Sequence, residues 1–435
     1  MSASDTAKFR AARHKNMPEI TFMTSNIPSQ ADICIIGAGP AGATTSMFLS
    51  KAGIPHLLID KDEFPRDKIC GDGIDANSIR VLNQFNPQLI AELHADCQHF
   101  TPIRGIKLTA PNGKSSEALH RPTPKSAPEP MYFTCKRQYF DTFLHRQLNP
   151  EFANIQLGTQ VTNLERQDGG INVTMTKNGA THTTFARLVI GADGDHSVVL
   201  RKLDERKIDR NFYAAALRMY CRNVSDMHPE NLLEIYFPKK VNLGYFWIFP
   251  LPNGEMNVGF GMSSQEVSIK KINLRHVFED IIHSDPFFAH RFRNADFLET
   301  PQGWGLPLAA RERKNVGDHF LLAGDAGSLV QPLNGEGIGS AMISGLIAAQ
   351  FAQKAVAHQR FDADFLQKYQ TESSKRMSKE IRSYKQILSL PSNSGLLKNI
   401  FLNTFIATGA AKYAFERGAR QWVNTAMHKP ILVDL

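Results

Sequence analysis

A glycine-rich turn directly after the first apolar run restricts the fold of this chain more than any other feature. The apolar run Ile33-Cys-Ile-Ile36 leads into Gly37-Ala-Gly-Pro-Ala-Gly42, a helical pattern continues to about Ala52, and a second apolar run covers His56 to Ile59. A strand, a helix and a second strand in this order form a βαβ unit, with which a parallel sheet begins. We therefore expect an α/β fold.

The spacing of the three glycines also predicts a ligand. In Gly-x-Gly-x-x-Gly, the glycines permit a tight turn, a close approach of backbone N–H groups to a pyrophosphate, and close packing of the next helix on the sheet. An acidic side chain about 20 residues later binds a ribose hydroxyl, and Asp60 follows Gly42 by 18 residues. Together these features predict a dinucleotide, although such a turn alone can simply join two elements. The candidate ligand-binding residues are Gly37, Gly39, Pro40, Ala41, Gly42, Asp60 and Lys61.

The length and the order of the patterns predict several domains. The chain has 435 residues, of which 42% are hydrophobic, so it is globular and exceeds one ordinary core. The α/β pattern is interrupted by a proline-rich segment and later by alternating strands such as Tyr245-Phe-Trp-Ile-Phe249, which predict an inserted antiparallel β-sheet. We expect a flexible N-terminal arm at 1–30, a Rossmann-like domain in three parts at 31–100, 131–204 and 301–355, an inserted substrate domain at 101–130 and 205–300, and a helical C-terminal region at 356–435.

The cysteines and the hydropathy restrict the cellular setting. The five cysteines are an odd number and form no Cys-x-x-Cys pair, so we expect neither a disulfide framework nor a metal site. No run approaches the roughly 20 apolar residues of a membrane span, and the N-terminus lacks the apolar core of a signal peptide. We expect a cytoplasmic protein.

Most of the positive charge lies in the last part of the chain. The formal net charge is +8, and Lys375 to Leu435 hold ten Lys or Arg against three Asp or Glu. No nucleic-acid-binding motif accompanies them, so we expect no nucleic-acid partner. The basic residues flank the mostly apolar stretch Ser394 to Ile406. Two interpretations stay open, a surface helix with a solvated basic face or peripheral contact with anionic lipid at the inner face of the cytoplasmic membrane. The sequence indicates no oligomeric state.

Two later segments specify the dinucleotide. Leu188-Val-Ile-Gly-Ala-Asp-Gly194 and Phe320-Leu-Leu-Ala-Gly-Asp-Ala-Gly327 are apolar strands that end in a Gly-Asp turn, and each alone can be an ordinary turn. In order and spacing, together with the first glycine turn, they resemble the flavoprotein hydroxylase superfamily, whose members fold like p-hydroxybenzoate hydroxylase. The resemblance implies FAD as the cofactor.

The same resemblance implies roles for residues outside the first turn. Asp325 would accept a hydrogen bond from the ribityl chain of the flavin, and the amides of Gly335 to Ile338 would stabilise the negative charge of the reduced ring. Arg137 would approach the phosphates as a planar cation, and Val161 would contact the adenine side. The further cofactor-binding residues implied are Asp193, Gly324, Gly337 and Ile338.

The second motif departs from the superfamily at one point. The usual pattern places an arginine three residues after the serine, whereas here Arg201 follows Ser197 by four. The resemblance therefore carries no role over to Arg201. We expect the neighbouring His196 to be a surface turn residue.

Three segments are similar to the geranylgeranyl reductase family within that superfamily. Phe64-Pro-Arg-Asp-Lys-Ile-Cys-Gly-Asp-Gly-Ile74 resembles its signature after the second strand, and Gly244-Tyr-Phe-Trp-Ile-Phe-Pro250 resembles its aromatic substrate-domain motif. Asn334-Gly-Glu-Gly-Ile338 resembles its third motif, with Asn334 where threonine is common. The resemblance covers roughly residues 31 to 350. It implies reduction of isolated double bonds in the geranylgeranyl or polyprenyl chain of a lipid precursor, a prenyl diphosphate or a quinone, by hydride from reduced flavin and a proton from a nearby acid.

Within these motifs Cys70, Tyr245 and Trp247 are the candidate catalytic residues. Cys70 can donate a proton or position the substrate beside the flavin, or it can simply fit a tight turn as a small residue. The aromatic residues around Phe246 can line an apolar tunnel that positions the alkene and excludes water, and core packing explains them equally well. Arg66 can face a phosphate or solvent. The candidate cofactor contacts of the first motif are Arg66, Cys70, Gly71 and Gly73.

The electron donor and two other function classes stay open. Only one dinucleotide-binding turn is present, so we expect electrons from transient NAD(P)H or from a reduced electron-carrier protein. An FAD-dependent monooxygenase (hydroxylase) or halogenase acting on an apolar or aromatic substrate shares the fold, but the paired tryptophans and the Ile-Pro ending of the halogenase signature are absent near Trp247. The basic tail also suits a non-enzymatic, membrane-associated flavin carrier.

Overall fold

A largely parallel β-sheet forms the core of the first domain. The computed structural model describes residues 26–120, 132–204, 210–239, 241, 244–309, 313–389, 402–413, 416 and 430–432. The strands of the first sheet are β1 (Gln30–Ile36), β2 (His56–Ile59), β8 (Ala153–Gln156), β9 (Thr159–Gln167), β10 (Gly170–Lys177), β11 (Ala180–Gly191), β18 (Val316–Gly317) and β19 (Phe320–Leu322). Their order is β18-β19-β11-β1-β2-β8, and the five strands from β19 to β8 are parallel. Strands β9 and β10 continue antiparallel from β11 around the turn Asn178-Gly179.

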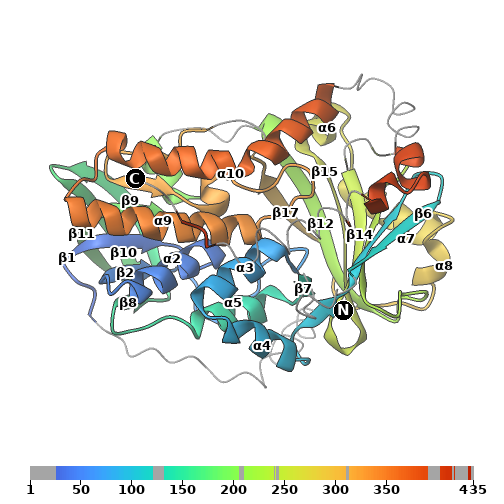
Figure 1. The fold of residues 1–435 in the computed structure, drawn as a ribbon, viewed down its shortest axis with the longest axis horizontal. Helices are drawn as coiled ribbons and strands as arrows, with labels where there is room; N and C mark the ends of the chain where they lie inside the picture. Colours follow the sequence, from blue (N-terminus) through green and yellow to red (C-terminus); the bar gives the residue numbers. More distant parts are fainter. Residues whose placement is uncertain are drawn as a thin grey trace.

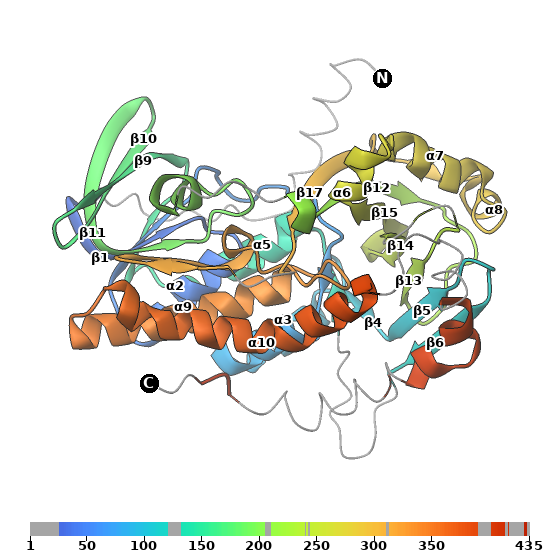
Figure 2. The same ribbon diagram turned by 90° about the horizontal axis from the view of Figure 1, so that it is seen from above.

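Both faces of this sheet are covered, which explains its continuous apolar strands. The helices of the domain are α2 (Pro40–Lys51), α3 (Ala76–Phe85), α4 (Gln88–Ala95), α5 (Arg137–His145), α9 (Ile338–His358) and α10 (Ala363–Ser389). Ile33 and Ile35 pack in the helical layer, whereas Cys34 and Ile36 pack on the side of β9 and β10. Figure 2 shows α9 and α10 on one face of the sheet and the β9–β10 hairpin on the other.

The inserted domain is a second eight-stranded sheet. Its strands are β5 (Gly105–Thr109), β6 (Ser115–Leu119), β12 (Tyr213–Arg222), β13 (Leu232–Tyr236), β14 (Gly244–Pro250), β15 (Glu255–Ser263), β16 (Asp296–Phe297) and β17 (Gln302–Pro307). They follow the order β16-β12-β15-β14-β13-β5-β6, with β17 beside β12. All pairs are antiparallel except β5 with β13. Strand β17 extends the sheet beyond residue 300, where the predicted segment ends.

The two faces of the second sheet have different neighbours. The helices α6 (Ser264–Ile269), α7 (Leu274–Ser284) and α8 (Ala289–Phe292) belong to this domain. Phe246 and Ile248 of β14 and Phe260 of β15 pack with Phe278 of α7 in one hydrophobic cluster. Figure 1 shows α7 and α8 on the outer side of the molecule. The alternate residues of the same strands therefore point inward, toward the first domain.

The remaining elements join the two sheets. A three-stranded sheet contains β3 (Gly73–Ile74), β4 (Thr101–Ile103) and β7 (Tyr132–Thr134), and short helical turns are η1 (Leu200–Asp204), η2 (Arg210–Phe212), η3 (Pro252–Gly254) and η4 (Gly324–Gly327). After α10, residues 402–407 and 410–413 are helical, and Ile406 packs on Ala110 beside the second sheet. These elements confirm the predicted α/β fold with an inserted sheet and a helical C-terminal region.

Some predicted features fall where little of the chain is described. Nearly all of the N-terminal arm, the proline-rich segment and much of the stretch from Ser394 to Ile406 lie outside the described residues. Among the helices that the structure does describe, none combines the length and the apolar character needed to cross a membrane.

Candidate active site

A cavity of about 1940 Å³ lies between the two sheets and extends from the glycine-rich turn to the inward face of the second sheet. Ligand cavities commonly measure about 300–1,000 Å³, so this one can hold a dinucleotide together with a second long ligand. All the predicted site residues except Gly42 and Gly324 line it. The tertiary structure therefore brings together three motifs that are far apart in the sequence.

The glycine-rich turn fits a phosphate-bearing ligand. Gly37 has a φ of 98°, and a Cβ there would lie 2.3 Å from the carbonyl oxygen of Ala192. A Cβ at Gly42 would lie 1.8 Å from the carbonyl oxygen of Gly37, so Gly42 serves close packing instead of ligand contact. A Cβ at Gly39 would meet only the Arg66 guanidinium, at 3.5 Å. Gly39 thus leaves space at the N-terminus of α2, where the helix dipole favours an anion.

Asp60 ties the end of β2 to this turn. Its Oδ2 accepts a hydrogen bond from the Ala38 amide at 2.6 Å, and its Oδ1 accepts one from the Asp62 amide at 2.9 Å. Each carboxylate oxygen has a second lone pair, and Asp60 lines the cavity beside Lys61 and Val161. The carboxylate can therefore still bind a ribose hydroxyl.

The Gly-Asp turn at residues 191–194 leaves one carboxylate oxygen of Asp193 without a partner among the described residues. Oδ2 of Asp193 accepts a hydrogen bond from the Val198 amide at 2.6 Å, whereas the buried Oδ1 has no hydrogen-bond partner among the described residues. Burial raises the pKa of Asp193. Because a buried acceptor without a partner is costly, this oxygen fits a ligand hydroxyl at the cavity wall.

The Gly-Asp turn at residues 324–327 places Asp325 beside the N-terminal end of α9. Gly324 has a φ of 60°, and its amide donates to Ser344 Oγ at 2.9 Å, which packs this glycine between helices and away from the cavity. Asp325 and Gly337 line the cavity side by side, because a Cβ at Gly337 would lie 3.4 Å from Asp325 Oδ1. The amide end of α9 carries partial positive charge. It therefore suits the negative charge of a reduced flavin ring.

Arg137 is held mainly by the protein itself. Its Nε and Nη2 each donate to a different oxygen of Asp141, both at 2.8 Å. Burial works against the charged guanidinium, but Asp141 and Cys70 outweigh burial and raise the pKa of Arg137. Arg137 lines the cavity, and its predicted contact with phosphate stays a prediction.

Arg66 lies beside the glycine-rich turn and is mostly shielded from solvent. Its Nη2 is 3.3 Å from Asp141 Oδ2, and its side chain is 16% exposed. Since the same nitrogen is the nearest atom to a Cβ placed at Gly39, the guanidinium borders the space left for a phosphate. Arg66 is therefore shielded from solvent at the cavity wall, and its contact with a phosphate stays a prediction.

Cys70 follows on the same loop and keeps its proton at neutral pH. Burial raises the pKa of its thiol, although Arg137 and Lys68 oppose the effect. Gly71 lies against the second sheet, since a Cβ there would be 3.8 Å from Trp247 Nε1 and from the Phe249 ring. The thiol can therefore act as an acid, or it can simply occupy a tight loop.

Side chains alternate between the two faces of β14, so the residues of the aromatic motif have two different environments. Tyr245 and Trp247 line the cavity, whereas Phe246 is fully buried in the helix-facing core and cannot line a tunnel. Tyr245 donates its hydroxyl hydrogen to the carbonyl oxygen of Asn334, and burial raises the pKa of Tyr245 to about 12. This bond joins the second sheet to the loop before α9.

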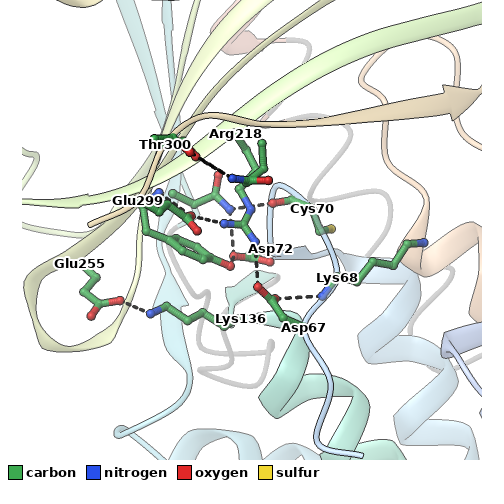
Figure 3. A network of polar contacts seen from close by, with 12 residues as sticks. Asp67, Lys68, Cys70, Asp72, Lys136, Arg218, Glu255, Glu299 and Thr300 are labelled. Carbon is green, nitrogen blue, oxygen red and sulfur yellow. Dashed lines mark hydrogen bonds and ion pairs between the residues drawn. The ribbon is translucent and has the colours of Figure 1, made fainter. Parts of the chain in front are cut away.

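The sequence analysis missed several polar residues of the site. Asp72 is fully buried with a φ of 62°, and burial raises the pKa of its carboxyl to about 6. Asp75 and Glu336 also line the cavity, and burial raises the pKa of each carboxyl. Figure 3 shows Cys70, Asp72 and Arg218 within one polar network. One signal was available, because Arg218 is a charged residue in the middle of a mostly apolar strand.

His196 is an exposed turn residue, as expected, and it also borders the cavity. Its ring is 6.0 Å from that of Trp304. Arg201 donates to the carbonyl oxygen of His196. The extra residue in the second motif thus leaves the arginine bonded to its own loop.

Comparison with known proteins identifies the family of this chain. The family model described as FAD binding domain matches residues 30–383. The digeranylgeranylglycerophospholipid reductase of Methanococcus vannielii is 31% identical over 342 residues, which cover 78% of this chain and 81% of that protein. The menaquinone reductase of Mycobacterium tuberculosis is 29% identical over 333 residues, which cover 75% and 77% of the two chains.

Solved structures show the same fold. A geranylgeranyl bacteriochlorophyll reductase-like protein from Thermoplasma acidophilum superposes with a TM-score of 0.73 at 22% identity, covering 91% of this chain and 99% of the other. A flavin-dependent brominase superposes with a TM-score of 0.66 at 20% identity, covering 91% and 99%. At such identities the likeness concerns the fold alone. Taken with the family match and the relatives above, the chain belongs to the FAD-binding domain family, as an FAD-dependent oxidoreductase of the geranylgeranyl reductase family.

Proposed function

We propose that this protein is an FAD-dependent reductase that saturates isolated C=C bonds in a geranylgeranyl or polyprenyl chain, carried by a lipid precursor, a prenyl diphosphate or a quinone. One observation carries the proposal. The cavity continues without interruption from the dinucleotide-binding loops to the inward face of the second sheet, and Cys70 and Trp247 border it where the two meet. When bound, FAD supplies the hydride.

The part of the cavity beside the second sheet suits a long apolar chain. It is lined by Ala214 and Ala216 of β12, by Leu233 and Ile235 of β13, and by Gly261 of β15. The two alanines and the glycine are small and leave room along it. Burial of each methylene group contributes about 0.8 kcal/mol. An isoprenoid chain can thus be held, and water excluded, by apolar contact alone.

The acids at the cavity wall can supply the proton. Cys70, Asp75 and Glu336 all line the cavity, and burial favours the protonated form of each. Each can therefore hold a proton at the wall next to a bound alkene. The electrons come from NAD(P)H or a reduced carrier protein that binds transiently, since the chain has one dinucleotide-binding turn.

Incubation of the anaerobically photoreduced enzyme with geranylgeranyl substrates is expected to re-oxidise the flavin and to add two hydrogen atoms per saturated bond. Flavin absorbance and product mass measure the two effects. The matched control is the fully saturated analogue with the same head group, which binds but offers no double bond. Oxygen or halogen incorporation under aerobic conditions, with no reduction of any prenyl lipid, would instead assign the monooxygenase or halogenase class.

We further propose that the basic C-terminal region contacts anionic membranes, where the prenyl substrates reside. The variant Lys398→Gln/Arg417→Gln/Arg420→Gln is expected to bind vesicles with anionic lipid at least roughly tenfold more weakly, because each basic residue near such a surface contributes about 1 kcal/mol. Vesicle sedimentation measures this binding, and neutral vesicles serve as the control. Equal binding of the variant and the native protein to anionic vesicles contradicts the proposal.

A further inference from the structure

A single buried amide joins two motifs from different domains. Asn257 of β15 is fully buried. Its Oδ1 accepts a hydrogen bond from Trp247 Nε1 at 2.9 Å. Its Nδ2 donates to the carbonyl oxygen of Cys70 and to Oδ2 of Asp72, both at 2.8 Å. The bonds to the Cys70 loop span 187 and 185 residues of sequence.

The chemistry of the partners fixes the orientation of this amide. The indole N–H of Trp247 can only donate, and the Cys70 carbonyl and the Asp72 carboxylate can only accept. An amide with its oxygen toward the indole and its nitrogen toward the loop satisfies all three groups. Neither a carboxylate nor an apolar side chain at position 257 can do so, because both lack the two N–H donors.

A second residue of the sheet supports the same loop. Tyr220 donates its hydroxyl hydrogen to Asp72 Oδ2 at 2.7 Å, and it pairs with Asn257 across β12 and β15. Asp72 needs such support because its φ of 62° is uncommon for a residue with a side chain. Figure 3 shows the network continuing through Arg218, whose guanidinium is 3.2 Å from Asp67. The loop from Asp67 to Asp72 is thus fastened to the sheet at several points.

The indole is also confined by its neighbours. A Cβ at Gly259 would lie 1.9 Å from the Trp247 ring, so the ring occupies the space that this glycine leaves. The ring also lies next to Gly71, where a Cβ would be 3.8 Å from the Trp247 Nε1. The hydrogen bond that the indole donates to Asn257 then selects one position of the ring relative to Cys70.

We propose that Asn257 is a positioning residue, which sets Cys70 and Trp247 at a fixed separation at the cavity wall. Asn257 does not line the cavity, whereas Cys70 and Trp247 both do. It therefore acts through these two residues and has no contact of its own with a ligand. The inference rests on the proposed function, because an alkene bound between Cys70 and Trp247 must be held at a fixed orientation to react.

The variant Asn257→Asp is expected to lower kcat by on the order of 100-fold at pH 8, while KM changes less than about threefold, because a misplacement of about 1 Å costs this much. The introduced carboxylate would face Cys70 and Asp72 on the loop and Tyr220 and Arg218 on β12, with only the indole donating to it from β14. Protonation restores one O–H donor, so kcat of the variant is expected to rise as the pH falls toward 6. We expect no such rise for the native enzyme.

A milder variant and a matched control keep the test decisive. Asn257→Ser retains one hydroxyl and is expected to lose about tenfold in kcat. The control Tyr236→Phe removes the bond from a buried tyrosine to Asp285 at 3.0 Å in the helix-facing core of the same sheet. It should lower stability without changing kcat.

Alkylation of Cys70 in the folded holoenzyme, measured by peptide mass spectrometry, supplies a readout that needs no substrate. Both Asn257 variants are expected to be alkylated at least about fivefold faster than the native protein and the Tyr236→Phe control. Unchanged kcat and alkylation in the Asn257 variants overturn the inference. If the native enzyme reduces no prenyl compound, the proposed function fails, and the alkylation rates still decide the role of Asn257.

Discussion

Replacement of Gly37 by alanine is expected to abolish the retention of FAD. The native φ of 98° is unfavourable for any residue with a side chain, and the added Cβ would lie 2.3 Å from the Ala192 oxygen and 2.7 Å from the Asp193 Cα. These atoms belong to the Gly-Asp turn at residues 191–194, so the backbone must move where two cofactor-binding loops meet. We expect less than about one tenth of the native flavin content, because even a 1.4 kcal/mol loss of affinity is tenfold.

The ratio of flavin to protein absorbance after gel filtration measures this effect. Gly169→Ala is a matched control, because Gly169 has a φ of 74° and nothing lies within 4 Å of a Cβ placed there. It carries the same kind of backbone strain, of roughly 1–2 kcal/mol, in the turn between β9 and β10. The control should retain FAD. Native flavin content in Gly37→Ala contradicts the assignment of this turn.

The second large effect is expected for Arg137→Met. This substitution removes the bidentate partner of Asp141, whose side chain is 0% exposed. Arg66 at 3.3 Å stays beside the carboxylate, and Lys68 still acts on it electrostatically. Breaking a buried ion pair costs about 3–5 kcal/mol. We expect about 3 kcal/mol here because Arg66 remains. Urea unfolding of the holoenzyme, followed by circular dichroism, measures the change.

The pH dependence identifies the cause of this loss. Burial would raise the pKa of Asp141, but Arg137 and Arg66 hold it below its ordinary value. A depressed pKa stabilises the folded state above the unfolded pKa of about 3.9 and ceases to do so as the pH falls through the folded value. Without Arg137 the carboxyl should bind a proton more readily in the folded state. The deficit of the variant should therefore be largest at neutral pH and shrink on acidification.

Two comparisons complete this prediction. Arg137→Met/Asp141→Leu removes both charges and should recover most of the lost stability. Arg291→Met breaks a second buried pair, with Glu234 at 2.7 Å, away from the cavity. The Arg291→Met variant should also be less stable than the native protein, and it should retain FAD because this ion pair lies away from the cavity. If the double variant is no more stable than Arg137→Met, an uncompensated charge on Asp141 is not the reason for the loss.

The sequence by itself determined the class of the protein. The order of apolar runs predicted the parallel sheet, because side-chain periodicity and glycine turns act over a few residues. The spacing of Gly37, Gly42 and Asp60 predicted a dinucleotide, and the later motifs resembled FAD-dependent reductases. These inferences needed no knowledge of how the two sheets lie against one another.

Only the tertiary structure decided how the site is assembled. Strand alternation places Phe246 and Trp247 on opposite faces of the second sheet. Which of these faces meets the cofactor-binding loops depends on how the whole sheet packs against the first domain. In the same way, Arg66 borders Gly39 while Arg137 is held by Asp141. The bonds of Asn257 to the Cys70 loop join residues 187 and 185 positions apart. Such contacts leave no local pattern, because their energy is gained only when two separately formed sheets bury their polar groups against each other.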